Sequence, residues 1–312
     1  MATTCSILIN TAGGLGIFLL GLNQLSEGLQ AVAGKRLRKI VAACTSNRFA
    51  GIVTGAFVTG IVQSSSVVTV MVVGLVTAGV MTLRQAVNVV VGSNIGSTTT
   101  AWFVVLLPTK LGDQSMIIIA VAALFYLFAK REKVRYTALA SLGIGLVFFG
   151  LELMSKGLSP LRSDPGFIEW FHMFDASTLW GVLKCVLMGS LVTAVIQSSA
   201  ASAAISISLA YNGVISFETA VALVFGMNIG TTITAWLAAL TASTEARRAA
   251  LAHTLFNCIG VVILAPLFML VIVPWLHHAF PTMMEGQSTA SGMVYPKITA
   301  PIALVHTGFN VV

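Results

Sequence analysis

The sequence predicts an all-α integral membrane protein with two inverted-topology repeats, each holding a re-entrant helical hairpin and a broken transmembrane helix. Composition, internal duplication and the lengths of the apolar segments lead to this fold class. Of the 312 residues, 57% are hydrophobic and 9% are charged, whereas a soluble domain carries about 25% charged residues. Apolar runs of about 20 residues recur along the chain, long enough to cross a bilayer as helices. A soluble protein with a large core is the weaker alternative.

The duplication becomes visible when the sequence is shifted by 134 residues. Positions 55–102 then align without a gap to 189–236, and 20 of the 48 pairs are identical. A match driven by composition would fall mainly on Val, Ala and Leu, but here the identical pairs include Gln63/Gln197, Asn94/Asn228 and Trp102/Trp236. A weaker similarity links "LLGLNQLSEGL" (19–29) to "FFGLELMSKGL" (148–158). The two halves are therefore duplicates.

The first repeat, residues 1–135, contains two apolar arms of about 14 residues on either side of "QSSS". Such arms are too short to span a bilayer comfortably, so we expect a re-entrant hairpin with its tip near the middle of the membrane. The expected elements are, in order, a helix over 6–30, a basic amphipathic stretch over 31–44, the arms 49–62 and 67–81, a helix over 84–107 interrupted by "GSNIGS", and a helix over 114–129.

The second repeat, residues 136–273, has the same order of elements. We expect a helix over 136–158, a hairpin over 179–215 with the tip "QSSA", an interrupted helix over 217–242 and a helix over 249–273. Residues 274–312 are expected to form an external loop and a final transmembrane segment from about 297. The chain ends inside that apolar run, as a truncated chain would.

Counting the crossings gives the orientation of the repeats. The hairpin adds no net crossing, so the first repeat crosses three times and the second starts on the opposite face, as in many secondary transporters. Of the 17 Lys and Arg residues, this topology places 12 on one side and 5 on the other. The positive-inside rule makes the richer side cytoplasmic. We therefore predict a multi-pass protein of the cell (inner) membrane with its N-terminus outside.

The hairpin tips predict an anion site. Each tip precedes a helix, and a Ser at a helix start caps free backbone N–H groups. Capping alone is the structural alternative, but it accounts for one Ser in each tip and leaves the other Ser residues and the Gln without a role. Helix N-termini with spare hydroxyls bind anions without Lys or Arg. The candidate substrate-binding residues are Gln63, Ser64, Ser65, Ser66, Gln197, Ser198 and Ser199.

The two Gly-x-Asn-x-Gly segments predict a sodium site. Because Gly is unfavourable inside a helix, by about 1 kcal/mol, we expect an unwound turn whose carbonyls, with Asn and hydroxyl oxygens, suit an alkali cation. The alternative is close helix packing on small residues. The candidate sodium ligands are Asn94, Ser97, Thr98, Asn228, Thr231 and Thr232. A cation held by neutral oxygens and an anion held without a basic residue would each supply the other's counter-charge, which favours coupled transport.

Other features are less specific. The paired "AHTLFN" and "VHTGFN" contain His residues that are better explained by structural hydrogen bonds than by proton transfer, and residues 162–175 look like an amphipathic segment at the outer interface. The net charge of +7 fits cytoplasmic loops, so no nucleic-acid partner is expected. Four scattered Cys residues are expected to be free. No catalytic constellation is apparent, so an enzyme is not predicted.

With these motifs identified, the sequence resembles the type II sodium/phosphate cotransporters and their bacterial relatives. The resemblance rests on "QSSS", "QSSA", "GSNIGSTTTAW", "GMNIGTTITAW", "EARRAALAHTLFN" and "HTGFN", and it spans nearly the whole chain. It implies sodium-driven movement of inorganic phosphate, with the Gln-Ser tips at the substrate site and Na⁺ as the coupling ion. One departure is Ala200, which replaces a third Ser in the second tip. Some bacterial relatives also continue into a cytoplasmic helical domain.

The resulting hypothesis is a sodium-coupled secondary transporter of inorganic phosphate that works by alternating access around a midplane site. Three alternatives remain open: a transporter of another oxyanion or small carboxylate, an anion channel, and an anion-sensing membrane subunit. The expected partners are inorganic phosphate and the lipid bilayer. The oligomeric state is left open, with a homodimer as one option.

Overall fold

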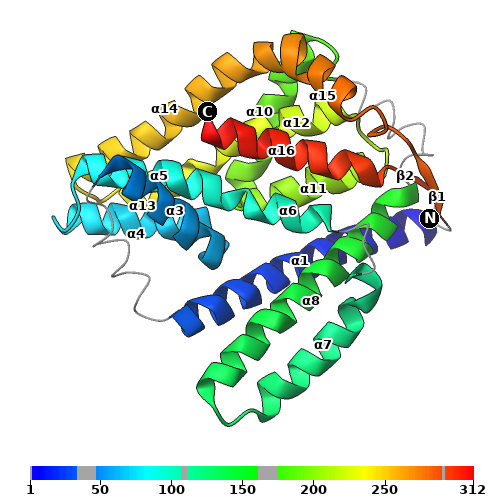
Figure 1. Cartoon of the computed structure of the whole chain (residues 1–312), viewed down its shortest axis with the longest axis horizontal. Coiled ribbons are helices and arrows are strands. Elements are labelled where there is room, and N and C mark those ends of the chain that lie inside the picture. The colour runs from blue at the N-terminus through cyan, green and yellow to red at the C-terminus, as the bar shows by residue number, and fades with distance from the viewer. Residues whose placement is uncertain (1, 34–46, 107–110, 161–173, 290–291) are drawn as a thin grey trace.

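The structure is a computed structural model that describes residues 2–33, 47–106, 111–160, 174–289 and 292–312. The predicted basic stretch over 31–44 and the interfacial segment over 162–175 lie mostly outside the described residues. The regular elements of the described part are helices, apart from one short β-hairpin (Figure 1). Five of its helices are long and apolar enough to cross a membrane. An all-α membrane protein is thereby confirmed.

Most predicted helices are found close to their expected bounds. In the first half they are α1 (Ala2–Ala33), α3 (Arg48–Val62), α4 (Ser65–Thr77), α5 (Leu83–Ser97), α6 (Thr99–Val105) and α7 (Leu111–Phe128). In the second half they are α8 (Glu132–Leu158), α10 (Leu179–Ile196), α11 (Ser199–Tyr211), α12 (Phe217–Thr231), α13 (Ile233–Ala239) and α14 (Thr244–Leu267). The last helix, α16 (Thr299–Val311), is the predicted final segment.

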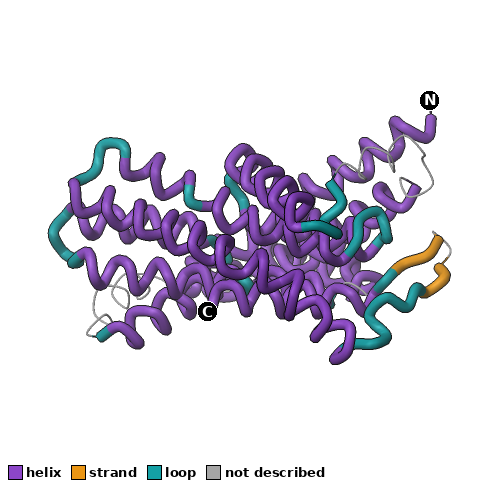
Figure 2. The backbone as a smooth tube through the Cα atoms, turned by 90° about the horizontal axis from the view of Figure 1, so that it is seen from above, coloured by secondary structure: helices purple, strands orange, loops and turns teal. Residues whose placement is uncertain are grey.

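The region between α14 and α16 contains structure that the sequence did not reveal. A π-helical turn (Phe268–Ile272) joins α14 to α15 (Val273–Ala279), and a hairpin of β1 (Gln287–Thr289) and β2 (Gly292–Val294) follows. Figure 2 shows this hairpin at one end of an otherwise helical molecule. A backbone hydrogen bond of 2.7 Å from Tyr295 to Tyr211 attaches this region to the end of α11.

Helices α1 and α8 run antiparallel and pack through glycines spaced seven residues apart. A Cβ added to Gly21 would lie 2.8 Å from the carbonyl oxygen of Gly143, and one added to Gly14 would lie 2.8 Å from that of Gly150. Small residues let helix backbones approach closely in membranes. Figure 1 shows α1 and α8 side by side, with α7 along α8.

The same close packing is duplicated between the hairpins and the broken helices. A Cβ on Gly92 of α5 would overlap the carbonyl oxygen of Ile52 in α3, and one on Gly226 of α12 would overlap that of Val186 in α10. The predicted unwound turn at the Gly-x-Asn-x-Gly segments is therefore wrong. Residues 92–97 and 226–231 are helical, because their glycines admit a neighbouring helix rather than open the backbone.

The breaks lie just after these segments, at Thr98 and Thr232. Each break is a tightened turn: the amide of Thr98 donates to Ile95 at 3.1 Å, and that of Thr232 donates to Ile229 at 3.0 Å. These are i→i+3 hydrogen bonds, typical of 3₁₀ geometry. The broken-helix prediction is thus correct in kind, but the breaks lie two residues beyond the second glycine of each segment.

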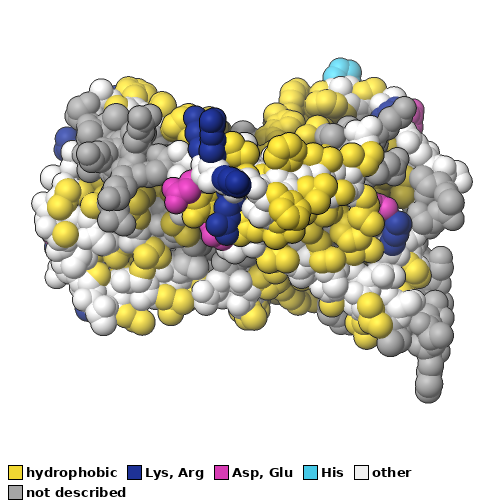
Figure 3. Space-filling model, turned by 90° about the horizontal axis from the view of Figure 1, so that it is seen from below, with side chains coloured by type: hydrophobic (Ala, Val, Ile, Leu, Met, Phe, Trp, Pro, Cys, Tyr) yellow, Lys and Arg dark blue, Asp and Glu magenta, His cyan; other side chains and the backbone are white. Residues whose placement is uncertain are grey.

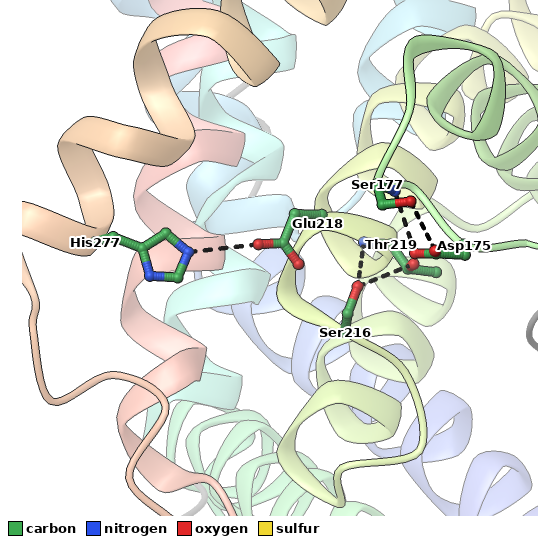
Figure 4. Close-up of polar contacts among 6 residues, drawn as sticks. All are labelled: Asp175, Ser177, Ser216, Glu218, Thr219 and His277. Carbon is green, nitrogen blue, oxygen red and sulfur yellow. Dashed lines mark hydrogen bonds and ion pairs between the residues drawn. The ribbon is translucent and has the colours of Figure 1, made fainter.

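The start of α12 is fixed by a group of polar contacts (Figure 4). Ser216 caps the helix by accepting from the amide of Thr219 at 3.1 Å, and the backbone amide of Ala176 donates to the Thr219 hydroxyl at 3.3 Å. Near this contact, Ser177 donates to Asp175 at 2.7 Å. His277 of α15 lies 3.5 Å from Glu218, so the end of α15 is held near the start of α12.

Much of the outer surface is apolar, as expected for helices in contact with lipid. Val262 and Leu270 are 74% and 78% exposed. Figure 3 shows hydrophobic side chains over a large part of one face, with Lys and Arg confined to a few places. Contiguous apolar surface of this kind marks a membrane or an interaction surface.

Candidate functional site

The two tips share an unusual backbone conformation. Gln63 and Gln197 end α3 and α10 with φ values of 54° and 55°. Among the described residues, these two are the only non-glycine residues with a positive φ. This region of φ and ψ is uncommon for residues other than Gly. The backbone N–H of each Gln donates at 2.7 Å to the backbone carbonyl of a threonine four residues earlier. The left-handed residue turns the chain sharply, so the next helix starts two residues later.

Ser64 and Ser198 are the caps of the helices that follow the tips. The Ser64 hydroxyl accepts from the amide of Val67 at 3.3 Å, and that of Ser198 accepts from the amide of Ala201 at 3.2 Å. Capping therefore accounts for one Ser in each tip. The first backbone N–H groups of α4 and α11 have no intrahelical partner, which makes both helix starts favourable for a negative charge.

A cavity of about 670 Å³ brings the two tips together. Its wall includes Gln63 and Ser64 of the first tip, and Ser198 and Ala200 of the second. The other predicted substrate residues, Ser65, Ser66, Gln197 and Ser199, are not among its lining residues. Ser65 is buried at the start of α4, and Gln197 is exposed.

The first tip is tied to the helix after the break in its own repeat. The hydroxyl of Thr100 in α6 donates to the side-chain oxygen of Gln63 at 3.2 Å, and the Gln63 amide group donates to the carbonyl of Gly60. In the second repeat, the equivalent Thr234 donates to the backbone of Thr231 at 2.9 Å. The two repeats therefore hold their tips differently.

One wall of the cavity comes from α1 and was missed from the sequence. Asn23, Ser26, Glu27 and Gln30 line it, together with Tyr136 of α8. Their spacing of three, four and seven residues places the α1 side chains on one helix face. A polar stripe within an apolar helix was the signal that could have identified them. In the sequence, Glu27 falls near the end of an apolar segment, away from the predicted sites.

Asn94, a predicted sodium ligand of the first repeat, lies in a buried polar group. Nε2 of His253 in α14 lies 2.9 Å from Oδ1 of Asn94, and Asn94 Nδ2 donates to Asn257 at 3.4 Å. Because an amide oxygen only accepts, the ring nitrogen is the donor. The His-Thr-x-Phe-Asn motif of α14 thus binds Asn94 directly, which agrees with a structural hydrogen-bonding role.

In the second repeat, Asn228 is held more loosely. Its Nδ2 donates at 3.2 Å to Val224 within α12. His306 and Asn310, on the second copy of the motif, are buried, and within the described part of the chain both ring nitrogens of His306 and Oδ1 of Asn310 have no hydrogen-bond partner. The two Asn positions are equivalent in sequence but not in their contacts.

The hydroxyls near the breaks donate hydrogen bonds to the backbone carbonyls that we expected to bind a cation. Ser97 donates to Asn94 at 2.7 Å, and Thr98 donates to Ile95 at 2.8 Å. In the second repeat, Thr231 donates to Met227 and Thr232 to Ile229, at 2.9 and 2.8 Å. A donating hydroxyl keeps its own oxygen lone pairs available. The oxygens that these side chains offer are neutral. Within the described residues, no group of three or more His, Cys, Asp or Glu side chains could hold a metal ion.

Two tryptophans connect the motif helices to the short helices after the breaks. Trp236 of α13 donates to Thr254 of α14 at 2.8 Å, and Trp102 of α6 donates to Thr307 of α16 at 3.0 Å. Both threonines follow the motif His, so the two contacts are equivalent. Helices α14 and α16 thus have corresponding positions: α14 packs against α5 and α13, and α16 packs against α6 and α12.

Comparison with known proteins identifies the family and relatives of this chain. A family described as Na⁺/Pi-cotransporter matches residues 17–156 and 173–273. An uncharacterized protein of Bacillus subtilis, YqeW, is 31% identical over 261 residues, covering 83% of this chain and 82% of the relative. The putative inorganic phosphate export protein YjbB of Escherichia coli K12 is 28% identical over 276 residues, covering 88% of this chain and 48% of its own length.

A more distant match extends to animals. The human sodium-dependent phosphate transport protein 2B is 37% identical over 110 residues, which cover 35% of this chain and 16% of the relative. The chain thus spans about half the length of the Escherichia coli relative. No solved structure matches it. The family match covers most of the sequence, and the chain belongs to the Na⁺/Pi-cotransporter family.

Proposed function

We propose that this protein is a sodium-coupled secondary transporter of inorganic phosphate that binds its substrate between the two Gln-Ser tips. The observation that carries the proposal is the single cavity shared by Ser64 and Ser198, each at the start of a helix. Two helix N-termini at one cavity provide backbone donors and positive dipole ends for one tetrahedral anion. The relatives named as phosphate transport or export proteins support phosphate as that anion.

The proposed phosphate site keeps all seven residues of the tips. Gln63, Ser64 and Ser198 line the cavity in this conformation, and Ser65, Ser66, Gln197 and Ser199 are one or two residues away in sequence. Alternating access would bring these remaining residues to the anion in another conformation. This role rests on the duplication of the tips.

Sodium is the proposed coupling ion. Among the described residues that line the cavity, none is Lys or Arg, so a bound anion needs a cation for its counter-charge. The proposed ligands are the oxygens of Asn94, Ser97, Thr98, Asn228, Thr231 and Thr232, near the breaks. The hydrogen bond between Gln63 and Thr100 connects the first tip to the first break.

The proposed mechanism uses two inverted repeats with re-entrant hairpins. The antiparallel packing of α1 against α8, whose sequences resemble each other, supports an inversion. Helices α3 and α4 have 15 and 13 residues, which favours a re-entrant hairpin in the first repeat. In the second repeat, α10 has 18 residues and is long enough to cross. The proposed location is the cell membrane, with the N-terminus outside.

Transport by the purified protein in proteoliposomes tests the proposal. Labelled phosphate should accumulate when a sodium gradient is imposed, in a direction that reverses with the gradient, and should not accumulate when potassium replaces sodium. Phosphate flux that is independent of the sodium gradient would identify a channel. Counterflow of sulfate or succinate in preference to phosphate would identify another substrate, and binding without flux would identify a sensor.

A further inference from the structure

The cavity between the tips has one carboxylate in its wall. Glu27 lies on the polar stripe of α1 with Asn23, Ser26 and Gln30, and all four side chains line the cavity that Ser64 and Ser198 share. Among the described residues that line the cavity, Glu27 is the single acidic residue. A carboxylate in the wall of an anion site is unexpected, because like charges repel.

The position of Glu27 is fixed by its two neighbours. The hydroxyl of Ser26 donates at 2.5 Å to the carbonyl of Val62, the last residue of α3 before the tip, and Gln30 donates to that hydroxyl at 2.6 Å. On the other side, Gly28 packs on α8, where an added Cβ would lie 2.7 Å from the carbonyl oxygen of Tyr136. The α1 backbone at Glu27 is therefore held between the first tip and α8.

Nothing in the described part of the chain neutralises this carboxylate. No ion pair there involves Glu27, and none of the described lining residues is Lys or Arg. Glu27 is exposed in this open cavity, so solvent screens part of the repulsion. Two like unit charges about 5 Å apart, at a dielectric constant between about 80 and about 20, lower a binding constant by a factor of roughly 4 to 300. Among the described lining residues, no positively charged side chain would offset this repulsion for a fully ionised anion.

An ionised carboxylate accepts hydrogen bonds but donates none. An anion that retains a proton can turn the repulsion into an O–H···O⁻ hydrogen bond, which is among the strong types. Phosphate and arsenate retain at least one proton near neutral pH, whereas sulfate retains none. We propose that Glu27 accepts a hydrogen bond from a protonated oxygen of the bound phosphate and thereby selects protonated tetrahedral oxyanions over fully ionised ones. This inference rests on the proposed phosphate site at the tips.

The second repeat offers a matched control. In the alignment of 19–29 with 148–158, Asn23 corresponds to Glu152 and Glu27 to Lys156. Glu152 and Lys156 form an ion pair of 2.6 Å on α8, and neither is a lining residue of the cavity. Glu152→Gln therefore removes one carboxylate from the equivalent helix face without altering the cavity wall.

The experiment measures competition by unlabelled phosphate, arsenate and sulfate for labelled phosphate bound to the full chain in nanodiscs, with sodium present. The unmodified protein should prefer phosphate and arsenate to sulfate. In Glu27→Gln, the ratio of sulfate to phosphate affinity should move toward unity by about tenfold or more, the usual size of a charged hydrogen bond. Glu152→Gln should keep the original ratio, and Glu27→Asp should keep the original order of preference.

Two results would overturn the proposal. One is an unchanged ratio in Glu27→Gln while phosphate binding persists, since the carboxylate would then play no part in selection. The other is an altered sodium dependence of phosphate binding in Glu27→Gln with an unchanged ratio of sulfate to phosphate affinity. That result would assign the carboxylate to sodium binding. Failure of the unmodified protein to bind phosphate would instead refute the proposed function, so the two failures are distinguishable.

Discussion

The hydroxyl of Thr100 lies 3.2 Å from the side-chain oxygen of Gln63 and donates a hydrogen bond to it. Thr100 belongs to the short helix after the first break, and Gln63 forms part of the wall of the cavity. This contact orients the Gln63 carboxamide so that its amide group points to the carbonyl of Gly60. It directly connects a tip with a break.

Removing that contact should weaken phosphate binding. Thr100→Val keeps the shape of the side chain but removes the donor, and a hydrogen bond of this type contributes about 1 kcal/mol, or roughly fivefold in affinity. Titration of the purified variants with labelled phosphate measures the effect. Thr234→Val is the matched control, because Thr234 donates to the backbone of Thr231, the last residue of α12, and not to a tip. An equal loss in both variants would show that the effect comes from the fold.

The two capping serines should act on one anion. Ser64→Ala and Ser198→Ala should each lower stability by about 1 kcal/mol through the lost cap, and each should also weaken phosphate binding. Because both residues line one cavity, the loss in the double variant should differ from the sum of the single losses. Ser243→Ala removes the cap of α14 and should leave phosphate affinity unchanged. Strictly additive losses would argue for two separate sites.

Asn228 tests the assignment of sodium. If its oxygen is a sodium ligand, phosphate and sodium must raise each other's affinity by the same factor. Asn228→Ala should then weaken phosphate binding in sodium by roughly 5- to 150-fold, corresponding to about 1–3 kcal/mol, and change binding without sodium much less. Calorimetric titration with phosphate in sodium buffer and in choline buffer measures the two affinities separately. Equal weakening in both buffers would assign Asn228 to the anion or to the fold.

The glycine contacts between α3 and α5 should govern stability. Gly92→Ala makes a methyl group overlap the backbone carbonyl oxygen of Ile52, and overpacking of this kind costs about 1–3 kcal/mol or more. Thermal unfolding in detergent should show a lower midpoint. Gly74→Ala is the control, since nothing lies within 4 Å of its added Cβ and Ala is the better helix former. Equal midpoints would contradict the close packing.

The proposed topology places Arg131 in the cytoplasm and the β-hairpin outside. In a cysteine-free background, Arg131→Cys should resist an impermeant maleimide added to intact cells, and Ser288→Cys should react with it. Labelling of inverted vesicles should give the opposite pattern. Reaction of both positions from the same side would rule out this topology.

The sequence predicted the fold well where polar residues interrupt apolar runs. The Gln-Ser tips end α3 and α10 at Val62 and Ile196, because a short polar stretch between two apolar arms favours a turn at that point. Gly92 and Gly226 were misread, because a glycine that opens a helix and one that admits a neighbouring helix look the same in one sequence. Only the partner backbones, at Ile52 and Val186, distinguish the two.

The site was harder to predict, because it combines segments whose relative positions the sequence does not encode locally. Ser64 and Ser198 were identified from their duplication, and both line the cavity. Glu27 and Tyr136 belong to helices outside the duplicated tips, and only their packing brings them to the same wall. The π-helical turn over 268–272 gave no sequence signal either, since its apolar residues fit an ordinary helix.

The glycine seam between α1 and α8 limits how these two helices can move. Gly14 and Gly21 repeat after seven residues, which is about 10.5 Å along a helix, and they face Gly150 and Gly143. A small axial slide would drive side chains into the opposite backbone, and only a slide of a whole repeat would restore glycine against glycine. We therefore expect α1 and α8 to move together as one rigid unit. A rearrangement that preserves these contacts would carry the α1 wall and the α8 wall of the cavity together.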